Sequence, residues 1–385
     1  DGNIYVTGKT ESDDFPTTSG AYDTSFNGGY NNVDVFVSRF NDDLTKLLAS
    51  TFLGGPGIDE AYSMSIDGNG NVYVAGCAAT DFPTTSSAYD TSWNGIWDAF
   101  VSKFNSDLTK LLTSTYLGGD NNDSAHSVAM DKDGNIYVAG DTYSDDFPTS
   151  SGAYDTSFNG RGADDDVFVS RFNGDLTKLL ASTFLGGDSY DYAYSAAIDK
   201  DGNIYVTGKT KSDDFPTTPD AYDPSHSLSN RELGNDVFVS RFNGDLTKLL
   251  ASTYLEGGSE DIAHSVAIDK DANIYVTGET ASGDFPTTPG AYGTSHYSDN
   301  DVFVSMFNGG LTRLLASTYL GGGSEDIAHS VTIDKDGNIY VAGYTTSSDF
   351  PTTSGGYDTS YNHDKNNVYG EGDIFVSRFY SNLSY

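Results

Sequence analysis

The sequence predicts an all-β protein with the fold of a β-propeller, and three observations support this. The motif N-I/V-Y-V-T/A-G recurs six times along 385 residues, at spacings of 68, 64, 68, 70 and 65 residues. The copies are short, rich in β-branched and aromatic residues, and bounded by Gly, Asp, Asn or Pro, which is typical of β-strands. A period this long with no helical pattern inside it indicates an array of repeat units. The marker tyrosines are Tyr5, Tyr73, Tyr137, Tyr205, Tyr275 and Tyr340.

Each repeat unit contains four strand segments. In the third unit they lie within 125–131, 135–140, 166–172 and 179–187. Val167 and Val169 share one face of the third segment, while Phe168 and Phe172 share the other. Because both faces carry large apolar groups, we expect each sheet to lie between two neighbours, as propeller blades do. A β-solenoid would have a shorter period, and a sandwich would not repeat its sequence.

The linked motifs resemble the SBBP repeat, a beta-propeller repeat family of bacterial and archaeal proteins that are mostly cell-surface or secreted. The resemblance rests on D-x-x-G-N-I/V-Y-V-T/A-G-x-T-x-S-x-D-F-P-T-T-x-G-A-Y-D, followed by D-V-F-V-S-R-F and L-L-A-S-T-Y-L-G-G. It extends over essentially the whole chain. It implies a propeller fold and no catalytic residues.

The number of strands differs from that of six complete blades. The second and third strand types occur six times each, but the first and fourth occur five times each, giving 22 strands. The first strands are predicted to begin at Ser63, Ser127, Ser195, Ser265 and Ser330. We therefore predict six blades of four-stranded antiparallel sheet, of which the first lacks its inner strand and the last its outer strand. Residues 1–385 form a single array in this interpretation, with units at about 1–60, 61–124, 125–192, 193–262, 263–327 and 328–385.

The incomplete blades lead to an expectation about the two ends. An open strand edge must be paired, covered or made unattractive. Either the natural chain continues at both ends or a neighbouring molecule donates strands. A start at Asp1 in mid-repeat, without Met, suggests a mature or excised piece of something longer.

Composition excludes several classes of function. Acidic residues outnumber basic ones 56 to 20, and the net charge of -36 disfavours nucleic acid and anionic lipid while attracting cations. The single cysteine, Cys77, has no partner for an intrachain disulfide. The sequence contains no transmembrane segment and no signal segment at its start.

Acidic residues recur at fixed repeat positions and are candidate calcium ligands, calcium being the cofactor that the sequence suggests. One set follows a fixed Leu by six residues in the links between blades: Asp59, Asp123, Asp191, Asp261 and Asp326. A second set precedes every Phe-Pro pair: Asp14, Asp81, Asp146, Asp214, Asp284 and Asp349. A third lies in the D-K-D-G-N hairpins: Asp131, Asp133, Asn135, Asp199, Asp201, Asn203, Asp334, Asp336 and Asn338.

Each set has a structural alternative. An aspartate can cap a turn by accepting bonds from backbone N–H groups, which needs no ligand. The D-K-D-G-N hairpin imitates the first half of a calcium loop, but no Glu completes it at the twelfth position. Its Asp-Gly pair is also ordinary turn chemistry.

Other residues are weaker candidates for sites. Trp93 and Trp97 lie in the shortest of the variable loops between second and third strands and are candidates for stacking on a glycan or for filling a gap between blades. His126, His264 and His329 share one repeat position that Tyr62 and Tyr194 occupy elsewhere, and this exchange favours packing over metal binding. Asn122 and Asn382 begin glycosylation sequons.

The function that these features favour is a non-enzymatic extracellular or cell-surface scaffold, which self-assembles into a filament or surface layer through its open strand edges. No G-x-S-x-G, H-E-x-x-H or P-loop motif is present. Two alternatives stay open: an adhesion-type module that binds glycan or peptide with structural calcium, and a polysaccharide-degrading enzyme. The expected partners are identical subunits or adjacent domains of a longer chain, and glycans.

Overall fold

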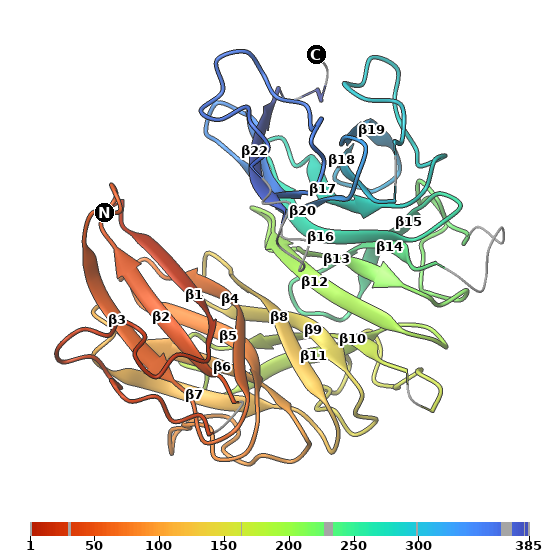
Figure 1. Cartoon of the computed structure of the whole chain (residues 1–385). Coiled ribbons are helices and arrows are strands. Elements are labelled where there is room, and N and C mark those ends of the chain that lie inside the picture. Colours follow the sequence, from red (N-terminus) through yellow and green to blue (C-terminus); the bar gives the residue numbers. More distant parts are fainter. Residues whose placement is uncertain are drawn as a thin grey trace. The chain divides into compact units, whose positions relative to one another are not determined.

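The protein consists of β-strands arranged in six antiparallel sheets. The computed structural model describes residues 2–29, 32–162, 164–226, 234–297, 299–362, 372–380 and 382–383. Within them are 22 strands and no helix (Figure 1). The sheets are the six blades of a β-propeller, and the predicted strand count is confirmed. The chain divides into two compact units: Asp1–Gly186 with Gly244–Lys248, and Gly187–Asn243 with Leu249–Tyr385.

The first unit holds blades 1 to 3. Blade 1 has three strands and lacks the first strand type, whereas blades 2 and 3 have four. In chain order the strands are β1 (Ile4–Thr10), β2 (Asp34–Phe40), β3 (Leu47–Leu53), β4 (Asp59–Ile66), β5 (Val72–Ala78), β6 (Asp98–Phe104), β7 (Leu111–Leu117), β8 (Asp123–Met130), β9 (Ile136–Thr142), β10 (Asp166–Phe172) and β11 (Leu179–Leu185).

The second unit holds blades 4 to 6. Blade 6 has three strands and lacks the fourth strand type, as predicted. The strands are β12 (Asp191–Ile198), β13 (Ile204–Thr210), β14 (Asp236–Phe242), β15 (Leu249–Leu255), β16 (Asp261–Ile268), β17 (Ile274–Thr280), β18 (Asp301–Phe307), β19 (Leu314–Leu320), β20 (Asp326–Ile333), β21 (Ile339–Thr345) and β22 (Asp373–Phe379).

Both faces of the third strands are buried in blades 2 to 5, as the apolar pattern predicts. In β10 the side chains of Val167, Phe168, Val169 and Phe172 have no exposed surface. Within each unit the valines of one blade pack against the phenylalanines of the next, so that each hydrophobic cluster spans a pair of blades. Burial of these faces is the main stabilising term between neighbouring blades.

Each complete first strand contains a β-bulge. In β12 the pairing register shifts between Ala193 and Ser195, so that Tyr194 is the extra residue. Opposite it lies Gly208, where an added Cβ would overlap the carbonyl oxygen of Tyr192. The glycine of the Y-V-T/A-G motif is therefore required by the close approach of this strand.

Candidate functional site

The aspartates predicted in the links between blades are the first residues of the inner strands. We expected these strands to begin at the following serines, but the segment before the bulge also pairs with the second strand. Asp123 is fully buried, and its Oδ2 accepts bonds from Gly119 N at 2.8 Å and Ser144 Oγ at 3.1 Å. The hydroxyl of Thr142 donates to its Oδ1. These contacts match the structural alternative, in which the aspartate caps a turn and binds no metal ion.

In blades 1 to 5 a second buried aspartate begins the third strand and lies beside the first: Asp34, Asp98, Asp166, Asp236 and Asp301. Asp98 accepts backbone bonds from Asn94 at 2.9 Å and Gly95 at 3.0 Å, and it has no exposed surface. Sequence reasoning missed this residue as a site candidate, although it stands at the same position in all six repeats. The pKa of Asp123 is raised to about 8 and that of Asp98 to about 6, mainly by burial, and the charge of Asp98 contributes to the shift of Asp123.

Four of the six aspartates before Phe-Pro accept bonds from the same links: Asp146, Asp214, Asp284 and Asp349. Asp146 Oδ1 accepts a bond from Asp120 N at 2.9 Å, and Asp214 Oδ1 accepts one from Asp188 N at 2.8 Å. At these four junctions two of the predicted aspartates thus accept bonds from backbone N–H groups, which accounts for their repetition without a ligand. Calcium binding at these positions stays a prediction.

The D-K-D-G-N hairpins are Asp-capped turns. Asp131 Oδ1 accepts bonds from Asp133 N at 2.9 Å and Asn135 N at 2.8 Å, and its Oδ2 accepts one from Asn135 Nδ2 at 2.8 Å. Gly134 has a φ of +80°, the left-handed conformation that favours glycine. The equivalent aspartates Asp199 and Asp334 accept the same three bonds from the residues that follow them: Asp201, Asn203, Asp336 and Asn338.

The shared His/Tyr position is the bulged residue of the inner strands. Tyr62 lies 4.9 Å from the ring of His126, and His264 lies 5.4 Å from that of His329. In the sequence, no carboxylate lies near these histidines at a spacing typical of metal ligands. In the structure, the neighbouring second strand brings a carboxylate close to two of them. His126 Nε2 lies 2.6 Å from Asp141 Oδ1, and the equivalent contact of His264, with Glu279, is 3.2 Å.

The two tryptophans are exposed to a similar extent. Trp93 occupies the position of Phe26 and Phe158, whose rings pack edge-on against the fourth strand, and is 40% exposed. Trp97 is 37% exposed, and its carbonyl accepts a bond from Asp123 N at 2.8 Å. The position of Trp93 favours the packing alternative, and ligand binding stays a prediction.

The two sequons differ in exposure. Asn122 is partly buried, with its carbonyl accepting a bond from Tyr143 N at 2.8 Å. Asn382 is exposed, but Ser384, which completes its sequon, lies outside the described residues. Glycosylation at either position stays a prediction.

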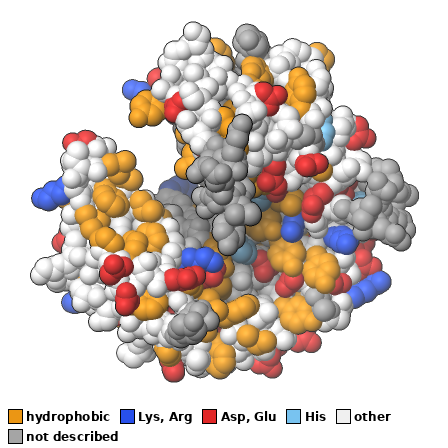
Figure 2. Space-filling view, viewed as in Figure 1, with side chains coloured by type: hydrophobic (Ala, Val, Ile, Leu, Met, Phe, Trp, Pro, Cys, Tyr) orange, Lys and Arg blue, Asp and Glu red, His pale blue; other side chains and the backbone are white. Residues whose placement is uncertain are grey.

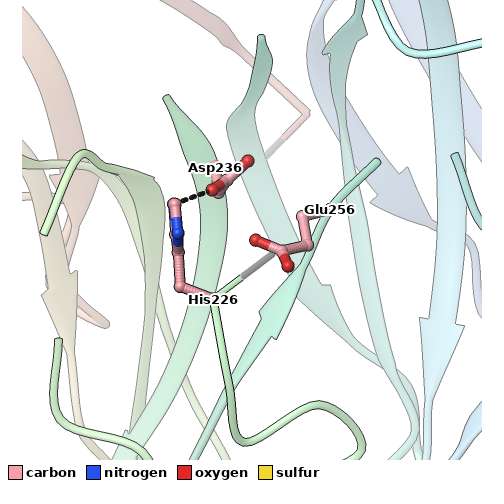
Figure 3. A group of neighbouring side chains, drawn as sticks. All are labelled: His226, Asp236 and Glu256. Atoms are coloured by element: carbon pink, nitrogen blue, oxygen red, sulfur yellow. Dashed lines mark ion pairs between the residues drawn. The ribbon is translucent and has the colours of Figure 1, made fainter. Parts of the chain in front are cut away.

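Blade 4 contains a cluster that no other blade repeats. His226 occupies the aromatic position of Phe26, and Glu256 replaces the first glycine of the L-G-G motif. His226, Asp236 and Glu256 point toward one another (Figure 3), and their ligand-type atoms all lie within 4.8 Å. Among the described residues this is the one place where three such side chains meet. The sequence contained a signal for it, the departure of L-E-G-G from the repeat.

The outer edge of β22 is open. In the five other blades the third strand pairs with a fourth strand, but within the described residues β22 pairs with β21 alone. Ile374 and Val376 are 85% and 70% exposed, whereas the equivalent Val302 and Val304 of blade 5 have no exposed surface. A groove of about 1110 Å³ runs beside the strand and is lined by apolar side chains that include Leu320, Phe350 and Phe379.

The surface charge agrees with the composition. On the face shown in Figure 2, acidic side chains are spread widely and basic ones are few. No helix that would be long and apolar enough to cross a bilayer occurs in the described part of the chain.

Comparison with known proteins identifies the repeat. The SBBP family model, described as Beta-propeller repeat, matches residues 50–83, 114–148, 182–216, 252–286 and 317–351. Each match starts in a fourth strand and ends at the next D-F-P, so it covers a junction between two blades. No curated protein matches the sequence.

Several solved structures are similar at low identity. A protein of unknown function from Dyadobacter fermentans is 12% identical, with a TM-score of 0.48 over 91% of this chain and 89% of that one. The gluconolactonase XC5397 from Xanthomonas campestris is 10% identical, with a TM-score of 0.38 over 80% and 78%. A putative gluconolactonase is also 10% identical, with a TM-score of 0.35 over 80% of both chains. The five repeat matches and the six blades confirm the predicted resemblance: the chain carries five matches to the SBBP beta-propeller repeat between residues 50 and 351.

Proposed function

We propose that this chain is a non-enzymatic, extracellular or cell-surface scaffold that associates with further copies of itself through the open sides of blades 6 and 1. The observation that carries the proposal is the exposed third strand of blade 6. Ile374 and Val376 are apolar residues at positions that are buried in other blades, but here their side chains are exposed. An exposed apolar strand with an unpaired edge is a site for strand addition.

Blade 1 offers a matching surface. Its first strand in the chain, β1, is an edge strand of its sheet because the inner strand type is missing. Val6 is 39% exposed, whereas the equivalent Val74 of blade 2 is fully buried. A contact between blade 6 of one copy and blade 1 of the next joins two different surfaces, and such a heterologous contact produces an open filament when it does not close into a ring.

Three further features support a scaffold. The motifs of common hydrolases and nucleotide-binding enzymes are missing from the sequence, and the recurrent aspartates accept turn bonds from the backbone. The net charge of -36 keeps the chain away from anionic partners. An extracellular setting follows from the resemblance to surface and secreted repeat proteins.

The self-association of the full chain tests the proposal. In analytical ultracentrifugation we expect the average mass to rise with protein concentration. Val376→Lys should weaken association by about tenfold or more, because burying an unpaired charge costs more than about 1.4 kcal/mol. Ile96→Lys, at a 62% exposed position in a loop of blade 2, is the matched control and should associate like the wild type. A wild-type chain that stays monomeric at every concentration would overturn the proposal, as would unchanged association of Val376→Lys.

A further inference from the structure

Blade 4 departs from the repeat at two positions that face the same aspartate. In blades 1, 2, 3, 5 and 6 the Oδ2 of the aspartate that begins the third strand accepts a bond from a loop N–H group, such as Asn94 N on Asp98 at 2.9 Å. In blade 4 the ring Nε2 of His226 contacts Asp236 Oδ2. The ring of His226 therefore places a nitrogen beside this aspartate.

The second departure puts a carboxylate where other blades have no side chain. Gly54 and Gly118 lie so close to the aspartates of their junctions that an added Cβ would come within 2.8 Å of Asp34 Cγ and 2.6 Å of Asp123 Oδ2. Glu256 stands at this position in blade 4. It directs a third acidic group toward a junction that already contains Asp236 and Asp261.

The group is buried. Glu256 is 8% exposed, Asp236 5% and Asp261 0%, and the side chain of His226 is 9% exposed. Carboxylates brought together away from water are costly unless a cation or a proton compensates them. A divalent cation would compensate two of them and would use the nitrogen of His226 as a further ligand.

The remaining ring nitrogen of His226 has an acidic neighbour. Its Nδ1 lies 3.3 Å from Asp213 Oδ1, and the Asp213 side chain is 44% exposed, at the outside of the cluster. A metal-binding histidine characteristically donates its second N–H to a carboxylate, which orients the ring. Asp213 is in the right place for this role, which leaves Nε2 directed toward Asp236 and Glu256.

We propose that His226, Asp236 and Glu256 bind a divalent transition-metal ion of the zinc type, with Asp213 as the residue that orients His226. Imidazole together with two carboxylates suits zinc and related metals, whereas calcium takes oxygen ligands. Three protein ligands leave a coordination position for water or for a group of a partner molecule.

Blade 5 provides an internal control. His296 and Asp301 occupy the positions of His226 and Asp236, but Gly321 stands where blade 4 has Glu256. Nε2 of His296 lies 3.2 Å from the carbonyl oxygen of Thr280. Because blade 5 has one carboxylate fewer, it should not bind the metal tightly. A comparison of the two blades therefore shows what Glu256 adds to a site that already contains a histidine and an aspartate.

The proposal is tested by treating the full chain with a chelator and then titrating it with Zn²⁺ in an isothermal calorimeter. We expect one saturable zinc site that Ca²⁺ does not fill. His226→Phe and Glu256→Gly, which restore residues of other blades, should each weaken zinc binding by about tenfold or more, and Asp213→Asn by roughly 10- to 100-fold. His296→Phe and His264→Tyr should bind like the wild type. Circular dichroism checks that each variant is folded, and Co²⁺ absorption reports the nitrogen ligand.

Three outcomes would overturn the proposal. The first is the absence of saturable zinc binding. The second is zinc affinity within about twofold of wild type in both His226→Phe and Glu256→Gly, since loss of a metal ligand weakens binding more than this. The third is loss of binding in His264→Tyr instead, which would assign the ion to the histidines of the inner strands. If Glu256→Gly does not fold, Glu256→Gln and His226→Phe decide the question.

Discussion

Single residues decide how this propeller responds to pH, because its buried aspartates hold protons more tightly in the folded chain than in the unfolded one. The pKa values of Asp59, Asp166 and Asp261 are raised to about 7, mainly by burial, and the charge of a neighbouring aspartate contributes to each shift. Each group therefore stabilises the fold below its unfolded pKa of about 4, and this contribution is lost as the pH rises through the folded pKa.

The stability of the chain should accordingly fall between pH 4 and pH 8. We expect the melting temperature in the presence of a chelator to be higher at pH 5 than at pH 8, because protonation removes buried charge. Differential scanning calorimetry over this range measures the slope. Asp123→Asn should make the slope shallower and cost about 1–3 kcal/mol, since its amide N–H₂ would face either the Thr142 hydroxyl or the donors Gly119 and Ser144.

Asp133→Asn, at an exposed hairpin position, controls for the loss of a negative charge alone. It should leave the slope close to that of the wild type. A melting temperature that stays level or rises from pH 5 to pH 8 would contradict the assignment of raised pKa values to the buried aspartates.

The strand elements explain where sequence reasoning succeeded. The second and third strands follow an apolar pattern on both faces, and the structure has them at the predicted positions, from Tyr73 in β5 to Phe379 in β22. The first strands were predicted four residues too short, because the bulge at residues such as Tyr194 breaks the period of two on which strand prediction depends.

The blade 4 cluster was harder to predict. His226 and Glu256 are 30 residues apart in the sequence, and only the pairing of β14 with β15 brings them to one place. Each appeared as a substitution within a repeat: Glu for Gly in blade 4 alone, and His for another aromatic residue in blades 4 and 5. A comparison of the repeats for their differences, position by position, would have selected both residues.

The bulge predicts the effect of a mutation in the second strand. In Gly208→Ala the new Cβ would overlap the carbonyl oxygen of Tyr192, so the backbone of the bulge must move. We expect a loss of more than about 3 kcal/mol in the free energy of unfolding, at the upper end of single substitutions. Chemical denaturation measures it. Gly283→Ala, where no atom lies within 4 Å of the added Cβ, is the control and should change stability by less than about 0.5 kcal/mol. Similar stabilities for the two variants would refute the steric role of Gly208.

For the whole molecule, the five complete pairings of third and fourth strands define what the open edge of blade 6 should accept. In blade 5 Ser305 faces Ser317 across the sheet, and their hydroxyls are 2.8 Å apart, as in the equivalent pairs of blades 1 to 4. We expect a strand added to the outer edge of β22 to pair in the same register as β19 pairs with β18. A strand with the fourth-strand sequence should therefore pair with β22 so that its serine faces Ser377 and its tyrosine faces Phe375.

A peptide with the sequence of residues 314–320, LLASTYL, should bind the full chain at this edge. We expect saturable binding in fluorescence anisotropy, and competition of the peptide with self-association, because both use the outer edge of β22. The variant peptide with Ala for Ser should bind roughly fivefold more weakly, as expected for one lost hydrogen bond of about 1 kcal/mol. The peptide with Pro for Thr is the matched control, because proline removes a backbone donor and cannot sit in a paired strand. Equal binding of the Pro peptide, or an unchanged affinity in Val376→Lys, would show that the peptide binds elsewhere and that β22 is not the acceptor.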